Sequence, residues 1–589
     1  MSRVLTIDKL RIDVRSGAGE ARRVVNDVSL SIESGQIAAL VGESGSGKTL
    51  IGRSVLRLLP PVAALSGGNI VFNGAPLQQL DEKQMRSLRG RQIGAVFQEP
   101  MVSLNPALTI GFQMMEAMRL HERVSKAEAR RRCVTMLEKV RIADPDEALR
   151  AHPRQFSGGM RQRIMLASVL AMRPRLLIAD EPTTALDALI RKEIMDLMVA
   201  LTREIGAAVL LISHDLALVA QYADDVTVLR RGETVEQGPP ARMLLHPTHE
   251  YTQALMDALP LRASTNEAVR TPLVEIEDLC VDFRRKRAAL WRRAATKRAV
   301  DKVTLSIYDG EVLAVVGESG SGKTTIGRTL LRLCESSSGS IRFGGQDFDG
   351  MDAAAIARFR TRTQMVFQDP YSSLDPRMTL GAIVAEGLRH VAGLDNGERL
   401  RQAREMLEEV GLPGAYLQRY PHELSGGQRQ RVCIARTIVA RPRFIVADEP
   451  VSALDVTIQR QVLQLLTRLQ EKYGFTYLFI SHDLGVVEQM ADRVAVMFRG
   501  RVLEIGARNE IFDSPRHPYT IRLLEATPRL VRRAGGAYEL HTFPARAQCA
   551  PAGHGYFNNG CIPGVPESRG VPLMIEVSSG HSVCCTRAE

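Results

Sequence analysis

Short apolar segments alternate with longer stretches of helical periodicity along most of this chain. The apolar segments, which are rich in β-branched side chains, are 36–41, 176–179, 209–213, 312–316, 444–447 and 477–481. Segments of this kind predict buried β-strands. Helix-rich stretches lie between them, including 126–140 and 397–410. Strands that alternate with helices favour an α/β core with a mostly parallel sheet, and the helix-rich stretches predict a helical subdomain.

The whole pattern occurs twice, so the sequence predicts two modules, at 1–260 and 271–530. The polar residues 261–270 are expected to form a short linker. Residues 531–589, rich in Gly and Pro and weakly periodic, are expected to form a C-terminal tail. The sequence contains no apolar run long enough to predict a transmembrane helix, and its first residues lack the apolar core of a signal peptide. We therefore expect a cytoplasmic chain.

Each module carries a Gly-rich loop that follows a predicted strand and matches the P-loop pattern Gly-x4-Gly-Lys-Thr. Glycines let backbone N–H groups converge on phosphate oxygens, and the next helix offers its positive N-terminal end. Lys48 and Lys323 should reach the β- and γ-phosphates, while Thr49 and Thr324 should place a hydroxyl on Mg²⁺. The predicted nucleotide-binding residues of the loops are Gly42, Glu43, Ser44, Gly45, Ser46, Gly47, Lys48 and Thr49, and Gly317, Glu318, Ser319, Gly320, Ser321, Gly322, Lys323 and Thr324.

Two adjacent carboxylates end a predicted strand in each module. Asp180 and Asp448 can hold Mg²⁺ or its water ligands. The next residues, Glu181 and Glu449, are candidate general bases for the attacking water. The same number of positions separates each Glu from the Ser-Gly-Gly segment before it, which is the spacing expected of two copies of one catalytic module.

The Ser-Gly-Gly segments precede predicted helices and predict a second anion site in each module. Their residues are Ser157, Gly158 and Gly159, and Ser425, Gly426 and Gly427, followed in the second module by Gln428. A P-loop together with this separate anion site resembles the ABC ATPase family, over roughly residues 1–530. The resemblance implies two P-loop ABC ATPase modules, each with a RecA-like parallel-sheet core, a helical subdomain and an antiparallel β portion. In that family two modules pack head to tail, so Lys48 would share one ATP with Ser425, and Lys323 another with Ser157.

The resemblance assigns further roles by position in the sequence. His214 and His482 would be switch histidines that contact the γ-phosphate. Gln98 and Gln368 would touch Mg²⁺ and the attacking water and report the nucleotide state to a partner. Asp187 and Asp455 would lie in the loops between the two ATP sites. With the two Glu residues, these His and Gln side chains form the expected catalytic set, and Thr49, Gln98, Asp180, Thr324, Gln368 and Asp448 form the expected Mg²⁺ set.

Two positions distinguish the modules. Met160 stands where the family usually has Gln, whereas Gln428 follows the family pattern, so we expect a mild asymmetry between two working sites. Phe283 is positioned to stack on adenine, but Val14 is its counterpart in the first module and offers no ring.

Further motifs indicate the subfamily. Ser103-Leu104-Asn105-Pro106 and the segments that begin at His249 and His517 resemble the ATPases of the oligopeptide, dipeptide and nickel importer group, fused end to end. The rival class is a soluble tandem ABC ATPase without a membrane partner, such as a translation factor, which typically has a long charged linker. A DNA-repair ABC ATPase would need zinc-bearing insertions, and a drug exporter would usually carry its own membrane spans.

The composition of the chain constrains its function less than the motifs do. The net charge of +11 fits a soluble basic protein, a phosphate-binding protein or one that approaches an anionic membrane surface. No nucleic-acid recognition motif accompanies the charge, so nucleic acid is not an expected partner. Four of the eight cysteines, Cys549, Cys561, Cys584 and Cys585, lie in the tail. Importers of this group often end in a cysteine-rich segment, so these four are tentative ligands of a [4Fe-4S] cluster, with zinc or free thiols as alternatives.

The sequence thus predicts an ATPase that uses ATP and Mg²⁺ to drive an importer for peptides or related small solutes. The resemblance implies two integral membrane permease subunits, a substrate-binding protein that feeds them, and a position on the cytoplasmic face of the inner membrane. The two modules would pair within the chain. Peptides, opines, glutathione and metal chelates all stay open as cargo.

Overall fold

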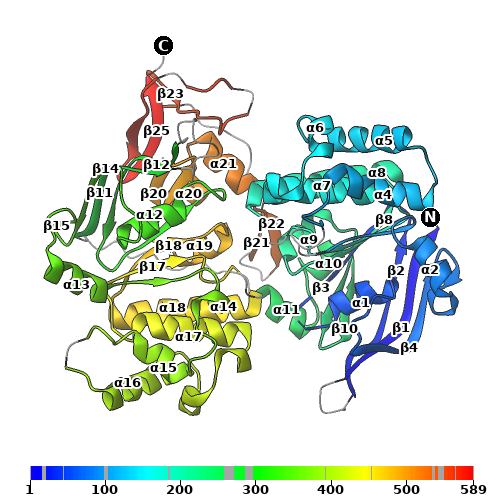
Figure 1. Ribbon diagram of the computed structural model, residues 1–589, viewed down its shortest axis with the longest axis horizontal. Coiled ribbons are helices and arrows are strands. Elements are labelled where there is room, and N and C mark those ends of the chain that lie inside the picture. Colours follow the sequence, from blue (N-terminus) through cyan, green and yellow to red (C-terminus); the bar gives the residue numbers. More distant parts are fainter. Residues whose placement is uncertain are drawn as a thin grey trace. The chain divides into compact units, whose positions relative to one another are not determined.

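Figure 1 gives the computed structural model of the chain. It describes residues 2–15, 21–43, 45–97, 104–183, 186–257, 271–284, 296–391, 393–452, 454, 456–532, 537–541, 550–563, 565–568 and 570–587. The chain divides into two units, Met1–Leu259 with Pro528–Thr542, and Pro260–Thr527 with Phe543–Glu589. The predicted linker, 261–270, lies outside the described residues, so the module boundaries there stay a prediction. Within the described residues, no helix has the length and apolar character needed to cross a membrane.

The first unit contains a six-stranded sheet in the order β10-β9-β3-β8-β7-β6 and a four-stranded sheet in the order β2-β1-β4-β5. Its strands are β1 (Arg3–Arg15), β2 (Ala21–Glu33), β3 (Ile37–Gly42), β4 (Ala63–Phe72), β5 (Ala75–Pro76), β6 (Ile93–Val96), β7 (Leu176–Asp180), β8 (Ala208–Ile212), β9 (Asp225–Arg230) and β10 (Glu233–Gly238). Its α-helices are α1 (Lys48–Val55), α2 (Glu82–Leu88), α4 (Ile110–His121), α5 (Lys126–Lys139), α6 (Pro145–Arg150), α7 (Gly158–Leu170), α8 (Ala188–Ile205), α9 (Leu216–Tyr222), α10 (Pro240–Met243) and α11 (Glu250–Asp257).

The second unit repeats this plan with a four-stranded sheet, β12-β11-β14-β15, and a larger nine-stranded sheet that includes the order β16-β17-β18-β13-β19-β20. These strands are β11 (Pro272–Arg284), β12 (Thr296–Tyr308), β13 (Val312–Val316), β14 (Ser338–Phe343), β15 (Gln346–Asp347), β16 (Thr363–Val366), β17 (Phe444–Asp448), β18 (Thr476–Ile480), β19 (Arg493–Phe498) and β20 (Arg501–Ala507). The helices are α12 (Lys323–Leu330), α13 (Ala353–Arg362), α14 (Pro370–Ser373), α15 (Leu380–Glu386), α16 (Asn396–Glu409), α17 (Gly426–Ile438), α18 (Val456–Tyr473), α19 (Leu484–Met490), α20 (Arg508–Asp513) and α21 (Pro518–Glu525).

The predicted α/β class is confirmed, because the central strands are parallel. β3 lies between β8 and β9 and is parallel to both, and β13 lies in the same way between β18 and β19. The continuous apolar runs have a physical reason: alternate residues of β3 face two different cores, so Ile37, Ala39 and Val41 enter one core and Ala38 and Leu40 the other. The four-stranded sheets supply the expected antiparallel portion.

The helix-rich stretches form as their sequence suggests. Ser125 caps α5 by accepting a hydrogen bond from the backbone of Glu128, and Asp395 caps α16 by accepting one from Glu398. Ala129, Cys133 and Leu137 recur at helical spacing and form the buried face of α5. In each unit two helices lie side by side beyond this stretch, α7 with α8 and α17 with α18 (Figure 1).

The C-terminal residues form strands in two separate places. Strands β23 (His554–Tyr556), β24 (Leu573–Ser578) and β25 (His581–Arg587) extend the large sheet of the second unit, where β25 pairs with β20. Glu504 of β20 is fully buried and accepts hydrogen bonds from the backbone of Arg516 and His517 at 2.7 and 3.0 Å. It also contacts Nε2 of His581 at 2.8 Å, which ties β25 to the ATPase sheet.

The hairpin of β21 (Arg529–Arg532) and β22 (Tyr538–His541) belongs to the first unit instead, although it follows the second module in sequence. Tyr538 is buried in the first unit's core, and its backbone N–H donates to the carbonyl of Leu245 at 3.0 Å. Leu530 packs against the same core, and both strands contact α9. A segment from beyond the second module thus completes the packing of the first unit.

Candidate functional site

The two Gly-rich loops connect a buried strand to a helix, as predicted. Gly47 precedes α1 with φ of 95°, and Gly322 precedes α12 with φ of 107°, a backbone region that favours glycine. A Cβ on Gly322 would lie 2.4 Å from the carbonyl oxygen of Ala299, so a larger residue has no room there. Neither helix has an acidic residue in its first turn, which leaves the positive helix end available to an anion. Ser44 lies outside the described residues.

The lysine of each loop is buried and points back along the loop. Nζ of Lys48 donates to the carbonyls of Gly42 and Glu43, both at 2.7 Å. Nζ of Lys323 donates to the carbonyls of Gly317 and Glu318 at 2.7 and 2.9 Å. A buried ammonium group surrounded by loop carbonyls is suited to receive phosphate oxygens.

Beside each lysine, a threonine hydroxyl meets an aspartate. Oγ1 of Thr49 donates to Asp180 at 3.2 Å, and Oγ1 of Thr324 donates to Asp448 at 2.9 Å. Burial raises the pKa of both aspartates, and the threonine hydrogen bonds only partly oppose it. A hydroxyl oxygen and a buried carboxylate fit Mg²⁺, which usually takes one or two carboxylates and completes its shell with phosphates and water. The described residues contain no group of three or more His, Cys, Asp or Glu that could hold a metal without such help.

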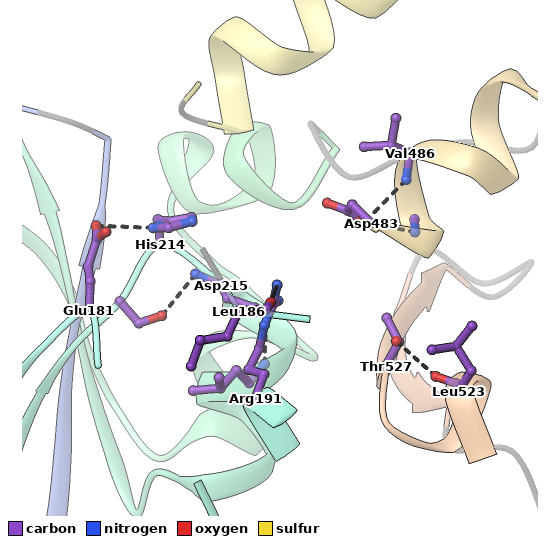
Figure 2. Close-up of polar contacts among 12 residues, drawn as sticks. Glu181, Leu186, Arg191, His214, Asp215, Asp483, Val486, Leu523 and Thr527 are labelled. Atoms are coloured by element: carbon purple, nitrogen blue, oxygen red, sulfur yellow. Dashed lines mark hydrogen bonds and ion pairs between the residues drawn. The ribbon is translucent and has the colours of Figure 1, made fainter. Parts of the chain in front are cut away.

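The candidate bases are paired with the candidate switch histidines. Nδ1 of His214 lies 3.1 Å from Oε1 of Glu181, and Nδ1 of His482 lies 3.1 Å from Oε1 of Glu449 (Figure 2 shows the first pair). Nε2 of Gln368 donates to the second oxygen of Glu449 at 2.7 Å. Gln98, the counterpart of Gln368, lies outside the described residues.

These pairs form because neighbouring parallel strands end at one edge of the sheet. β7 ends before Glu181 and its neighbour β8 ends just before the loop of His214. Glu181 and Glu449 both have φ of 48°, a left-handed conformation that costs a non-glycine residue conformational energy. Each is held there by its backbone N–H, which donates to Ile212 or Ile480 at 2.9 Å.

The two pairs perturb the pKa values of their members. Burial disfavours the charged imidazole of His214, but the hydrogen bond and the charge of Glu181 outweigh burial and raise its pKa. Burial also works against ionised Glu449, yet the hydrogen bond and charge of His482, the charge of Lys323 and the amide of Gln368 lower its pKa. Glu449 is therefore an ionised carboxylate at neutral pH, the state required of a general base.

The Ser-Gly-Gly segments begin helices, as predicted. Ser157 caps α7 by accepting from the backbone of Met160, and Ser425 caps α17 by accepting from Gln428, each at 3.4 Å. Only Gln428 returns a bond, because its side chain accepts from the backbone N–H of Ser425 at 3.1 Å. The Met160 difference thus removes one cap contact from the first module and leaves the serine and glycines in place.

The two glycines of each segment have different surroundings. A Cβ on Gly159 would lie 2.7 Å from Cγ2 of Ile190, whereas one on Gly158 would meet nothing within 4 Å. In the second unit a Cβ on Gly427 would lie 2.5 Å from Ile458, and Gly426 is again open. The second glycine therefore allows α7 to approach α8 closely.

We expect Gly159→Ala to destabilise the first unit by about 1–3 kcal/mol, because the added methyl group overpacks the contact with Ile190. Gly158→Ala, with open space at its Cβ, is the matched control and should leave stability unchanged. Urea unfolding of the full chain measures both. An equal effect of the two substitutions would contradict the steric role of the second glycine.

Phe283 and Asp187 lie within the described residues, as does Val14, the counterpart of Phe283. Phe283 lies on β11, is 46% exposed and can offer its ring to a ligand. Val14, on β1, pairs with Arg22 of the neighbouring strand β2. Asp187 is buried at the start of α8, and Asp455 lies outside the described residues.

The structure gives no support to an iron–sulfur cluster in the part of the tail that it describes. Cys584 and Cys585 are adjacent on β25, so their side chains point to opposite faces of the sheet. Burial raises the pKa of Cys561, and it raises those of Cys584 and Cys585 to about 12 and about 11, which disfavours the thiolates that ligate iron. Cys549 lies outside the described residues.

Sequence reasoning missed one side chain at the P-loop. The hydroxyl of Tyr251 on α11 accepts a hydrogen bond from the backbone N–H of Glu43 at 3.4 Å, and the guanidinium of Arg230 lies over its ring. His249 caps the same helix by accepting from the backbone of Tyr251. The segment that begins at His249 resembles a subfamily motif, but only the fold reveals that α11 returns to the P-loop.

Comparisons with known proteins agree with this geometry. The family described as ABC transporter matches residues 25–184 and 300–452. The oligopeptide/dipeptide transporter C-terminal region matches residues 235–276 and 503–562, once after each ABC transporter match. The second region includes Glu504 and His517, which join β20 to the segment that precedes α21.

Several known proteins are similar to this chain over most of their length and most of its own. The peptidoglycan transport ATP-binding protein YejF of Agrobacterium fabrum is 45% identical over 526 residues, 89% of this chain and 96% of that protein. The glutathione import ATP-binding protein GsiA of Pectobacterium atrosepticum is 41% identical, with 87% of each chain covered. GsiA of Escherichia coli strain K12 is 42% identical, with 89% of each chain covered.

The resemblance deduced from the motifs is confirmed, and an importer ATPase is favoured over a soluble tandem ATPase without a membrane partner. Both ATPase modules and both C-terminal regions are present in one polypeptide. This chain therefore belongs to the ABC transporter family, as a tandem ATP-binding protein of the peptide importer group.

Proposed function

We propose that this chain is the motor subunit of an importer for peptides or peptide-like solutes, and that both of its modules hydrolyse ATP. The observation that supports hydrolysis most directly is the duplicated Glu–His pair beside a P-loop lysine. Both pairs have the same separation of 3.1 Å and the same strained φ of 48° at the glutamate. Such strain persists only where surrounding structure enforces it, and it is typical of functional sites.

In this proposal the P-loops bind the phosphates of ATP. Lys48 and Lys323 contact the β- and γ-phosphates, and the loop N–H groups and the N-terminal ends of α1 and α12 complete the cradle. Mg²⁺, when bound, neutralises phosphate charge. The hydroxyl and carboxylate of Thr49 and Asp180 would hold it in the first module, with Thr324 and Asp448 in the second.

Glu181 and Glu449 act as general bases that accept a proton from the attacking water. His214 and His482 hold these carboxylates in place and contact the γ-phosphate, while Gln368 orients Glu449. Ser157, Ser425 and their glycines supply the second anion site, and Phe283 stacks on adenine. Pairing of the two modules around ATP, as the family resemblance implies, stays a prediction.

The cargo and partners rest on the relatives. The relatives named above are a peptidoglycan transport protein and glutathione import proteins, so peptide-like solutes with amide bonds and free carboxylates form the proposed cargo class. Two membrane permease subunits would carry the cargo, fed by a substrate-binding protein, with this chain at the cytoplasmic face of the membrane.

The test is ATPase activity of the chain co-purified with the permease subunits encoded beside it, in lipid vesicles. Activity should rise when a binding protein loaded with glutathione or a short muropeptide is added, and the unloaded binding protein is the control. Robust activity that ignores every membrane partner would instead assign the chain to the soluble tandem ATPases.

A further inference from the structure

The loop that carries His214 is held by the residue after it. The backbone N–H of Asp215 donates to Oγ of Ser213 at 3.0 Å. Oδ1 of Asp215 accepts a hydrogen bond from the backbone N–H of Leu218, at the start of α9, also at 3.0 Å. The second carboxylate oxygen contacts Nη1 of Arg191 at 3.0 Å (Figure 2). Asp215 thus fixes the loop by backbone bonds and also ties it to another helix.

Arg191 lies in the first turn of α8, which follows the loop of Asp187. Its Nη2 donates to the carbonyl of Leu186 at 3.4 Å, so one guanidinium joins that loop to the loop of His214. The side chains of Arg191 and Asp215 are each 28% exposed. An ion pair that is only partly exposed to solvent is screened less by salt than a fully exposed pair.

The second unit has an equivalent aspartate, Asp483, but a different residue at the position that corresponds to Arg191. The backbone N–H of Asp483 donates to Oγ of Ser481 at 3.0 Å, and its Oδ1 accepts from the backbone of Gly485 and Val486 at 2.9 and 3.4 Å. The residue of α18 that corresponds to Arg191 is Gln459, which carries no charge. Within the described residues, Asp483 forms no ion pair.

We propose that Arg191 is a positioning residue that holds the His214 loop against Glu181 in the first module, and that the second module lacks this restraint. Through the 3.1 Å contact of His214 with Glu181, a fixed loop keeps the proposed base in one orientation. The two ATP sites are then unequal before any nucleotide binds. This inference rests on the proposed function only for its effect on hydrolysis, since the restraint itself is a property of the fold.

The restraint is tested first by hydrogen exchange of the nucleotide-free full chain, with protection factors measured for segments 213–222 and 481–490. Arg191→Gln should lower protection of the first segment about threefold to fivefold, the size of effect given by a partly exposed ion pair, and leave the second unchanged. Gln459→Arg should raise protection of the second. Unchanged protection in Arg191→Gln would overturn the proposal.

The effect on catalysis is tested by steady-state ATPase assays of the same variants. Arg191→Gln should lower kcat with KM for ATP unchanged, and Arg191→Lys should recover part of the loss because it restores the charge. A rise in KM alone, or no rescue by Lys, would assign Arg191 a merely structural role. If the wild type itself shows no ATPase activity, the proposed function fails, while the exchange result still decides the restraint.

Discussion

The chain with Glu181→Gln and Glu449→Gln together will bind ATP but hydrolyse it about 10²–10⁴-fold more slowly than wild type, the range that a positioned general base contributes. Gln keeps the shape of each side chain and can still bond to its histidine, yet it cannot accept the proton of the attacking water. The P-loop contacts of Lys48 and Lys323 are untouched, so affinity for ATP should persist. Phosphate release measures hydrolysis, and fluorescent ATP measures binding.

The matched control is Glu138→Gln with Glu408→Gln, which removes the same charge from exposed helical positions of the two units. It should retain wild-type kcat. The two single variants show how hydrolysis is shared: a loss of about half in each would indicate equivalent sites, and an unequal loss would indicate the asymmetry inferred for Arg191. A double variant with undiminished kcat would mean that another group activates the water.

Much of the nucleotide site is predictable from sequence, because its residues either lie close together in the chain or follow strands that are easily recognised as apolar segments. The glycines of a P-loop must lie within a few residues of the lysine, so the motif alone places Lys48 and Lys323. Glu181 and His214 are far apart in sequence, but both follow apolar strands, and parallel neighbours bring their ends together. The all-apolar strands are predictable from sequence because these central strands are buried on both faces of the sheet.

Contacts that single polar side chains make between segments distant in sequence cannot be predicted in this way. Nothing in the sequence around Arg191 indicates that Asp215 is its partner, and Tyr251 gives no sign of its contact with the P-loop. The C-terminal residues are harder still. They are rich in Gly and Pro and their strands are short, so their periodicity is weak, and β25 is ordered by pairing with β20 and by the bond from His581 to Glu504.

Tyr538→Ala will destabilise the first unit, although residue 538 lies beyond the second module in sequence. Tyr538 is only 8% exposed and belongs to the first unit's hydrophobic core. Truncation of a buried aromatic side chain costs about 3–5 kcal/mol through lost apolar contact and the cavity left behind. The backbone bond from residue 538 to Leu245 is kept in the variant, so the loss reports on the side chain of Tyr538.

Hydrogen exchange of the full chain separates this effect from general destabilisation. Amides of α9 and α10, which lie in the unit that the hairpin joins, should lose protection, whereas those of β13 and β18 in the second unit should not. Val531→Ala is the control, because Val531 lies on the same hairpin but is 46% exposed. If both variants exchange like wild type, the hairpin is not part of the first unit's core. If only Tyr538→Ala opens that unit, the stability of the first ATPase module depends on a segment that follows the second module in sequence. Truncation of the chain after residue 527 would then weaken the first module, although the second module lies closer to the cut in sequence.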